Sequence, residues 1–258
     1  ALHIINELPL EEYLYSVVPS EMPTEYQKEA LKAQAVCARS YAIKQMAGKR
    51  LAALGAHVDD SVSFQVYNNL REDAASIAAV NETKGQVVFA ENQVAETYFY
   101  SVSAGVSAGI KEVWFAKKDR SYLMPCVLLG DSRKTLDLQK EADFSEFLQG
   151  EIKSYDTNSP WYRWRTTVSE KQLQQFISEK IKSRYEKNPT QIQTKQKDGT
   201  FFSTGQTELG EIKKVEILKR GKSGVAVMAQ ITGSKNTLRI YTEYNLRNLF
   251  GGEKLICL

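Results

Sequence analysis

The sequence predicts an α+β protein, with helices in its N-terminal part and strands behind them. Apolar residues recur at helical spacing between residues 10 and 46, whereas residues 211–241 alternate apolar with polar between glycines. The composition, 42% hydrophobic and 25% charged, is that of a globular protein. We therefore expect N-terminal helices packed on a mixed or antiparallel sheet.

The first helix is predicted over residues 9–18, because apolar residues at helical spacing follow an N-terminal proline. Pro19 and Pro23 then bracket the segment that contains Glu21. Each proline disfavours the helical conformation in the residue before it. We therefore expect a turn with Glu21 in it, and a groove at this turn between the first two helices.

The second helix is predicted from about Glu25 to Ala47, with Thr24 and Gln27 as a capping box at its start and Gly48 at its end. Its many alanines indicate close packing against neighbouring elements. The face expected to be buried contains Leu31, Ala35, Ala38, Ala42 and Met46.

Shorter elements are predicted in the rest of the chain. Strands are expected over residues 63–67, 85–89, 97–102, 211–218, 225–231 and 237–241, the last three as an antiparallel meander. Helices are expected over residues 73–80, near 144–152, and from Ser169, which Gln172 would complete as a capping box. Residues 195–199 are expected to form a loop.

The charge and the cysteine content argue against several classes of protein. A net charge of +3, without a basic-aromatic stripe, does not indicate a nucleic-acid partner. No segment approaches the roughly 18 apolar residues of a membrane span, and residues 1–9 show no signal peptide. The three cysteines (Cys37, Cys126 and Cys257) and two histidines (His3 and His57) show no metal-type spacing.

Two long gapped stretches carry a specific resemblance. One contains Glu12-Tyr13-Leu14, then residues 17–23 (VVPSEMP) and residues 29–42 (EALKAQAVCARSYA); the other runs through residues 79–85 and 95–105. Together they resemble the hallmark of the stage II sporulation protein D family and of its relative, the amidase-enhancer domain. The resemblance is strong over about the first 110 residues and implies one catalytic domain over residues 1–258, with residues 111–210 as a candidate inserted lobe.

The resemblance implies a lytic transglycosylase that cleaves the glycan strands of peptidoglycan, with Glu21 as the catalytic residue. Ordinary glycoside hydrolases need two carboxyl groups, one of them to act as nucleophile or to activate water. A lytic transglycosylase needs no water, so one carboxyl group can act first as acid and then as base. To hold a proton at neutral pH, Glu21 needs a raised pKa, which partial burial would supply.

Further polar and aromatic residues match the family pattern and are candidates for substrate binding. They are Lys32, Gln34, Arg39, Gln65, Tyr67, Tyr98, Ser101 and Ser103. For each of them a structural role is the open alternative, such as a surface lysine, an internal hydrogen bond or a solvent-facing strand residue. A cluster formed by Trp161, Tyr162 and Trp164 would be either a sugar platform or, as we favour, a buried aromatic cluster.

Two departures from the family pattern bear on the site. Phe64 stands where some sporulation members have a cysteine, so we expect no zinc, and no other metal or cofactor. Ser103-Ala104-Gly105 replaces the family's usual Ser-Gly-Gly turn.

The expected partners are peptidoglycan glycan strands, a cell-wall amidase and other sporulation proteins. The main alternative is a glycan-binding module that stimulates an amidase, and a scaffold with a vestigial glutamate is a third. We expect an extracytoplasmic protein, either secreted or anchored by a segment that this sequence does not contain.

Overall fold

The computed structural model describes residues 3–61, 63–114, 116, 119–128, 136–150 and 152–251. The chain divides into two compact units, residues 1–100 and residues 101–258, and each unit has a hydrophobic core of its own. The α+β class is confirmed, because helices and antiparallel sheets are both present. The assignment of residues 1–258 to one catalytic domain, with 111–210 as an inserted lobe, stays a prediction.

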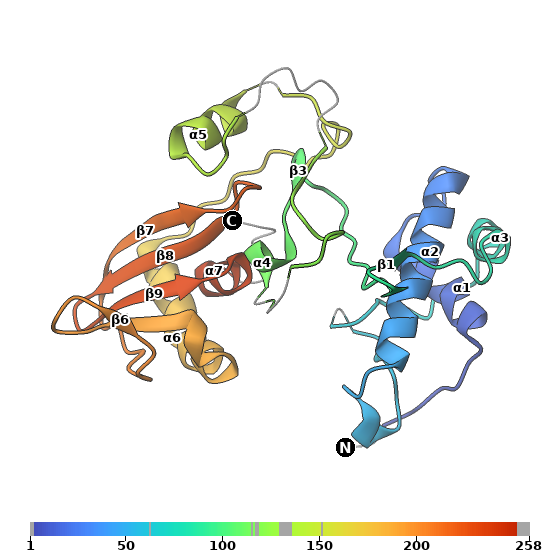
Figure 1. Ribbon diagram of the computed structural model, residues 1–258, viewed down its shortest axis with the longest axis horizontal. Helices are drawn as coiled ribbons and strands as arrows, with labels where there is room; N and C mark the ends of the chain where they lie inside the picture. Colours follow the sequence, from blue (N-terminus) through green and yellow to red (C-terminus); the bar gives the residue numbers. More distant parts are fainter. Residues whose placement is uncertain are drawn as a thin grey trace. The chain divides into compact units, whose positions relative to one another are not determined.

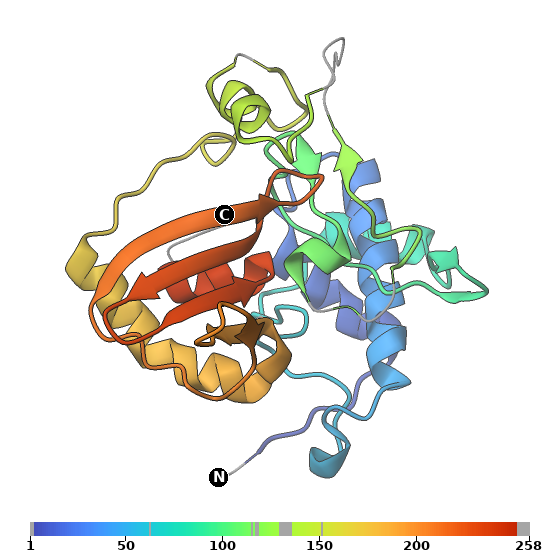
Figure 2. The same ribbon diagram turned by 60° about the vertical axis from the view of Figure 1, so that its left-hand side comes forward.

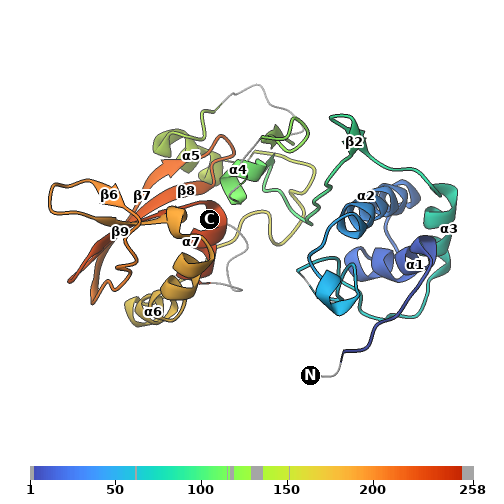
Figure 3. The same ribbon diagram turned by 60° about the horizontal axis from the view of Figure 1, so that its bottom comes forward.

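The first unit is built on three helices that contact one another, α1 (Leu10–Glu21), α2 (Lys28–Met46) and α3 (Ala74–Glu82) (Figure 3). A short 3-10 helix, η1 (Ala52–Leu54), and a hairpin of β1 (Phe89–Ala90) and β2 (Gln93–Val94) complete its regular structure. The core between the helices contains Leu14, Val17, Val18, Leu31, Ala35, Ala38, Ala79 and Val80.

Helix α1 continues through Pro19, so the prediction that it stops before this proline is wrong. A proline inside a helix costs about 3 kcal/mol, because a backbone hydrogen bond is lost. Burial of Val17 and Val18, at roughly 1.5 to 3 kcal/mol for each side chain, offsets that cost. Glu21 is therefore the last residue of a helix and does not lie in a turn.

Helix α2 begins at Lys28, three residues later than predicted. Its N-cap is Gln27, whose side chain makes no capping bond, so the expected capping box with Thr24 is wrong. The Tyr26 N–H instead donates to the Pro23 carbonyl at 3.2 Å in a turn. The buried alanine face is confirmed except at its end, where Met46 is exposed.

Helix α3 matches the predicted helix over 73–80, and the Asp73 side chain caps it by accepting from the N–H groups of Ala75 and Ser76. The strands expected over 63–67 and 97–102 are absent from the described residues there. Both segments are extended or irregular, because their polar groups bond to the helices beside them (Gln65, Val66 and Thr97 supply such bonds).

The second unit contains a five-stranded antiparallel sheet in the order β6-β5-β9-β8-β7 (Figure 1). The predicted meander is confirmed as β7 (Ile212–Arg220), β8 (Ala226–Gly233) and β9 (Thr237–Tyr241). The sequence did not reveal β5 (Ile192–Lys195) and the two-residue β6 (Phe201–Phe202), which follow the 3-10 helix η2 (Pro189–Gln191). Strand β7 is an edge strand, and its pairing with β8 has three register shifts.

One face of this sheet is covered by α6 (Glu170–Lys187) and α7 (Glu243–Phe250) (Figure 2). We expected the N-terminal helices in this position, but the core that contains Ile231, Leu238 and Ile240 is completed by helices of the C-terminal half. The predicted capping box of Ser169 and Gln172 at the start of α6 is confirmed.

The rest of the second unit is made of small elements. They are an antiparallel pair of β3 (Val106–Ser107) and β4 (Cys126–Val127), the short α4 (Ile110–Val113), which lies between these strands in the sequence, and α5 (Glu141–Gln149). Helix α5 begins three residues before the predicted helix near 144–152, and its Glu141 forms an ion pair of 2.7 Å with Arg220 at the end of β7. Among the helices that the structure describes, none has the length and apolar character needed to cross a membrane.

Candidate active site

Glu21 lies at the C-terminal end of α1, where its side chain is partly buried. Its Oε1 atom accepts a hydrogen bond of 2.7 Å from the backbone N–H of Val66, which is 45 residues further along the chain. The neighbouring Ser20 hydroxyl donates to the Ser16 carbonyl at 2.6 Å and accepts from the Asn68 N–H at 3.0 Å. Two hydrogen bonds thus join residues 66–68 to the end of α1.

Burial raises the pKa of Glu21, because it disfavours the charged form, and the hydrogen bond from Val66 opposes this rise without cancelling it. Six other carboxyl groups in the described part of the chain have a lowered pKa. Those groups are Glu11, Glu82, Asp137, Glu141, Asp156 and Asp198. Glu21 is thus the carboxyl group among them that is suited to hold a proton.

Two tyrosines, Tyr13 and Tyr41, interact electrostatically with this carboxyl group, and each of them packs against a second tyrosine. Tyr13 of α1 and Tyr67 stack with ring centroids 5.7 Å apart and planes 7° apart, and Tyr41 of α2 meets Tyr98 edge-on at 6.4 Å. Burial raises the pKa of Tyr13 and of Tyr41, and the charge of Glu21 contributes to both shifts. The four rings therefore give the first unit an aromatic cluster, two members of which respond electrostatically to Glu21.

Tyr67 and Tyr98 were predicted from the sequence, but Tyr13 and Tyr41 were not. Both missed residues stand inside the family motif, in Glu12-Tyr13-Leu14 and in Arg39-Ser40-Tyr41, so a signal for them existed. The expected groove at Glu21 stays a prediction.

Two predicted glutamines are buried in the first unit. Gln65 is fully buried, and its Nε2 donates to the Ala38 carbonyl at 3.2 Å while its Oε1 accepts from the Tyr13 hydroxyl at 3.3 Å. Gln34 of α2 is also buried, and its Nε2 has no hydrogen-bond partner among the described residues.

Arg39 is 1% exposed and ties three parts of the first unit together. Its guanidinium group binds both carboxylate oxygens of Glu11, at 2.9 and 2.7 Å, and donates to the carbonyls of Val80 (3.2 Å) and Gln86 (3.0 Å). Lys32, by contrast, lies near the surface, where its ammonium group contacts the carboxylates of Glu29 at 2.9 Å and Glu82 at 3.8 Å.

The remaining predicted residues belong to the second unit. Ser101 is exposed, whereas Ser103 binds Asp156 of the same unit. Oδ2 of Asp156 accepts from the Ser103 N–H (2.5 Å), the Ser103 hydroxyl (2.8 Å) and the Ala104 N–H (3.1 Å). Ala104 and Gly105 both have positive φ, 56° and 98°, and this turn is one that favours glycine. The Ser-Ala-Gly turn therefore encloses a carboxylate of the chain itself.

The described residues contain no group of three histidines, cysteines or acidic residues that could hold a metal ion. The ring of Phe64 lies under the guanidinium group of Arg50, 4.2 Å from its centroid. Cys37 and Cys126 are free thiols, and Cys257 lies outside the described residues. Of the C-terminal aromatic cluster, Tyr162 is buried and Trp164 packs against the core, but Trp161 is 56% exposed.

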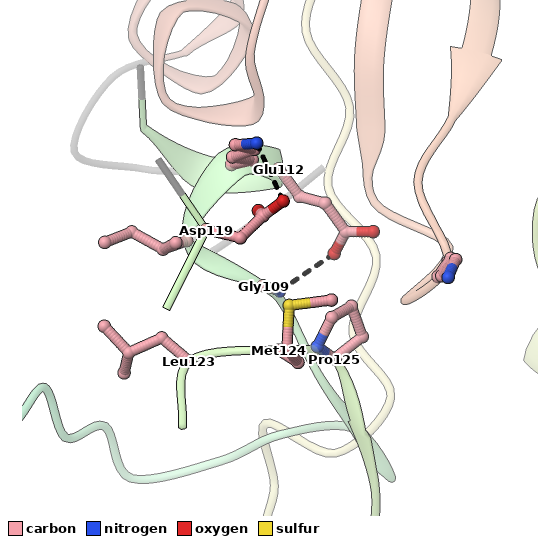
Figure 4. Close-up of a pocket in the computed structure, with 9 residues that line it drawn as sticks. Gly109, Glu112, Asp119, Leu123, Met124 and Pro125 are labelled. Atoms are coloured by element: carbon pink, nitrogen blue, oxygen red, sulfur yellow. Dashed lines mark hydrogen bonds and ion pairs between the residues drawn. The ribbon is translucent and has the colours of Figure 1, made fainter. Parts of the chain in front are cut away.

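A small pocket lies in the second unit, between α4 and the segment from Leu123 to Pro125 (Figure 4). Its volume is about 90 Å³, against the roughly 300 to 1,000 Å³ of typical ligand sites. Lys111 and Asp119 form an ion pair of 2.7 Å at this pocket, and Glu112 accepts from the Gly109 N–H at 2.9 Å. This pocket is too small for a sugar chain.

Comparison with known proteins identifies the N-terminal part of the chain. A family model described as "Stage II sporulation protein" matches residues 1–89, and a second one, described as a domain of unknown function, matches residues 108–198. Residues 1–89 therefore match the stage II sporulation protein family, and this match confirms the resemblance noted in the sequence. The second match overlaps residues 111–210.

Individual relatives agree with this assignment. The chain is 36% identical over 126 residues to stage II sporulation protein D of Bacillus amyloliquefaciens. This match covers 43% of this chain and 37% of that protein. The chain is 35% identical over 124 residues to stage II sporulation protein D of Bacillus subtilis, and this match covers 43% of this chain and 36% of that protein. The amidase enhancer of Bacillus subtilis is 34% identical over 113 residues, which are 41% of this chain and 15% of that protein. The chain thus spans less than two fifths of the length of each of these relatives.

Proposed function

We propose that this protein is a peptidoglycan lytic transglycosylase with Glu21 as its single acid and base. The names of its relatives, stage II sporulation protein D and amidase enhancer, support a role in sporulation and in the cell wall. The observation that carries the catalytic part is the raised pKa of a half-buried carboxyl group in the family domain. A general acid that works near neutral pH needs such a shift.

The proposed reaction has two proton transfers through the same carboxyl group. Protonated Glu21 donates its proton to the glycosidic oxygen as the bond from that oxygen to the muramoyl C1 breaks. The muramoyl C6 hydroxyl then attacks C1, and its proton returns to the Glu21 carboxylate. The products are a 1,6-anhydro-muramoyl end and a new glucosaminyl hydroxyl, and no water is consumed.

The tyrosines near Glu21 suit this substrate class, because sugar rings bind on aromatic faces with hydrogen bonds around them. Tyr98 is 38% exposed, so part of its ring is open to a ligand. Tyr67 and Tyr98 are therefore the predicted residues that we propose as contacts for the glycan. The proposed roles of Lys32, Gln34, Ser101 and Ser103 as substrate ligands rest on the family pattern alone.

The test is to incubate the protein with purified glycan strands, both with and without stem peptides, and to analyse the products by mass spectrometry. Anhydro-muramoyl ends are expected. Glu21→Gln should keep its fold and lose at least about 99% of the rate, because general acid and base catalysis is worth about a hundredfold or more. Glu25→Gln, at an exposed position four residues on, is the matched control and should cleave normally. A folded Glu21→Gln variant that retained a tenth of the rate would overturn the assignment.

A second candidate is a non-catalytic glycan-binding module that stimulates a cell-wall amidase, and the similarity to the amidase enhancer favours it. This module would bind glycan strands, accelerate an added amidase and release no anhydro-muramoyl ends. Under either proposal the protein works outside the cytoplasm, where its substrate lies. Fractionation of cells that produce the full protein would test the location.

A further inference from the structure

The segment from Phe64 to Asn68 has no regular secondary structure, yet four of its backbone N–H groups bond within the first unit. The N–H groups of Phe64 and Tyr67 donate to the carbonyls of Ser61 (3.0 Å) and Asp60 (3.4 Å). Those of Val66 and Asn68 donate instead to the side chains of Glu21 and Ser20, at 2.7 and 3.0 Å. Alternate residues of the segment therefore hold the end of α1.

Gln65 anchors this segment from the other side. Its side chain is fully buried, and its amide bridges two helices by donating to the Ala38 carbonyl of α2 and accepting from the Tyr13 hydroxyl of α1. Tyr13 is itself fixed by its stacking on Tyr67, two residues beyond Gln65. An unpaired buried amide is costly, so these contacts hold the backbone of the segment in one position.

We propose that Gln65 is a positioning residue that holds the Val66 N–H against Oε1 of Glu21. This hydrogen bond commits Oε1 as an acceptor and leaves Oε2 as the oxygen that carries the transferable proton. The catalytic consequence rests on the function proposed above, whereas the geometric part does not. Gln65 then acts through Val66 and touches no substrate.

Burial and the groups that face Glu21 together set its proton affinity. Besides the Val66 N–H, the phenols of Tyr13 on α1 and Tyr41 on α2 interact with its charge. Tyrosine is neutral near pH 7, and burial raises the pKa of both phenols further, so neither brings a charge to Glu21 at that pH. The Val66 hydrogen bond favours the charged form of Glu21. Loss of this bond should therefore raise the pKa of Glu21 further.

The test is an NMR titration of the full chain. Gln65→Met keeps the length and volume of the side chain but removes both amide hydrogen bonds. In the wild-type protein the Val66 amide signal should shift with the titration of the Glu21 carboxyl carbon. In Gln65→Met that linked shift should disappear and the pKa of Glu21 should rise. Gln27→Met, at an exposed glutamine whose side chain makes no capping bond, is the matched control and should titrate as wild type.

Activity on glycan strands gives the second readout. The kcat of Gln65→Met should fall about tenfold to a hundredfold at a nearly unchanged KM, since a displacement of about 1 Å at a catalytic group can cost a hundredfold. The alkaline limb of its pH profile should move to higher pH, because Glu21 must be protonated to act. A purely structural role would lower the amount of folded protein without moving this limb.

Tyr13→Phe provides an independent variant if Gln65→Met does not fold. It removes only the hydroxyl group that bonds Gln65 and keeps the ring that stacks on Tyr67, so the pKa of Glu21 should move upward by a smaller amount. An unchanged pKa of Glu21 in every folded variant, with Val66 still following its titration, would overturn the proposal. A wild-type protein that shows the titration effects but cleaves no glycan would uphold the positioning role and reject the transglycosylase.

Discussion

Replacement of Arg39 by methionine tests a buried side chain that makes four hydrogen bonds in the first unit. Arg39 lies in the interior of α2 and bonds Glu11 of α1 together with two carbonyls around α3 and the segment before β1. Arg39→Met keeps the aliphatic volume of the side chain and removes all four hydrogen bonds. The variant therefore leaves Glu11 and the carbonyls of Val80 and Gln86 without their shared donor.

The expected loss of stability follows from this geometry. Removal of one partner from a buried ion pair typically costs about 3 to 5 kcal/mol. The Glu11 side chain is 20% exposed, so water can solvate part of its charge, and we expect a value near the lower end, about 3 kcal/mol. The ratio of folded to unfolded protein should then fall on the order of a hundredfold.

Urea unfolding followed by circular dichroism at 222 nm measures this loss. With a slope of about 1 to 3 kcal/mol per molar urea, the midpoint should fall by about 1 to 3 M. All three tryptophans (Trp114, Trp161 and Trp164) lie in the second unit, so their fluorescence reports unfolding there. Arg71→Met, at an exposed arginine of the first unit, is the control and should lie within about 0.5 kcal/mol of wild type.

A loss below about 1 kcal/mol for Arg39→Met would show that the four bonds add little beyond packing. A shift of the tryptophan-detected transition alone would also contradict the reasoning, because Arg39 makes its bonds in the first unit.

Three further outcomes are expected. Ala35→Leu should destabilise the protein by about 1 to 3 kcal/mol and reduce glycan cleavage, because its site on α2 is fully buried. Ala33→Leu, at an exposed site of the same helix, should do neither. Equal thermal melts of the two variants and the wild type would show that α2 is not tightly packed. Burial raises the pKa of Asp156 but the bonds from Ser154 and Ser103 lower it more, so its contribution to stability is present above about pH 4 and is lost as the pH falls through the lowered value. Asp156→Asn should therefore flatten the dependence of the tryptophan-detected melting temperature on pH between about 5 and 2, and an unchanged profile would exclude this role. Elemental analysis of the dialysed protein should find no stoichiometric transition metal, and one zinc per chain would contradict our interpretation of Phe64.

Local patterns predicted the elements whose signals lie within a few residues. The capping pair of Ser169 and Gln172 marked the start of α6, and alternation with glycines marked the meander of β7, β8 and β9. Helix α1 was predicted too short, because the proline rule is local and burial of Val17 and Val18 outweighs it. Strand β5 pairs with the distant β9 on one side and with the two-residue β6 on the other. Both segments are short, so the sequence pattern within them carried little signal of a strand.

In the candidate site, too, the residues with a local sequence signal could be predicted and those without one could not. Glu21 could be named because a proline-bracketed acid is visible in the motif, and partial burial with a raised pKa agrees with what that role needs. The donor to Glu21 is a backbone group 45 residues away, and a backbone N–H has no sequence signature. Polar residues inside a motif look alike whether they bind a ligand or bond within the fold, so only the structure could show that Arg39 and Gln65 are buried with partners.

Strand β7 has a consequence for how the sheet can associate with other chains. A nine-residue edge strand offers unpaired backbone groups on which another chain could add a strand, and Ile217 and Leu218 are exposed beside them. Lys214 pairs with Glu216 on the same strand, but the exposed Lys213 and Lys219 add positive charge there, so two copies would repel each other if these edges met. The three register shifts against β8 twist and bend the strand further from the flat form that aggregation requires. The irregular pairing of this edge thus protects the sheet against intermolecular assembly.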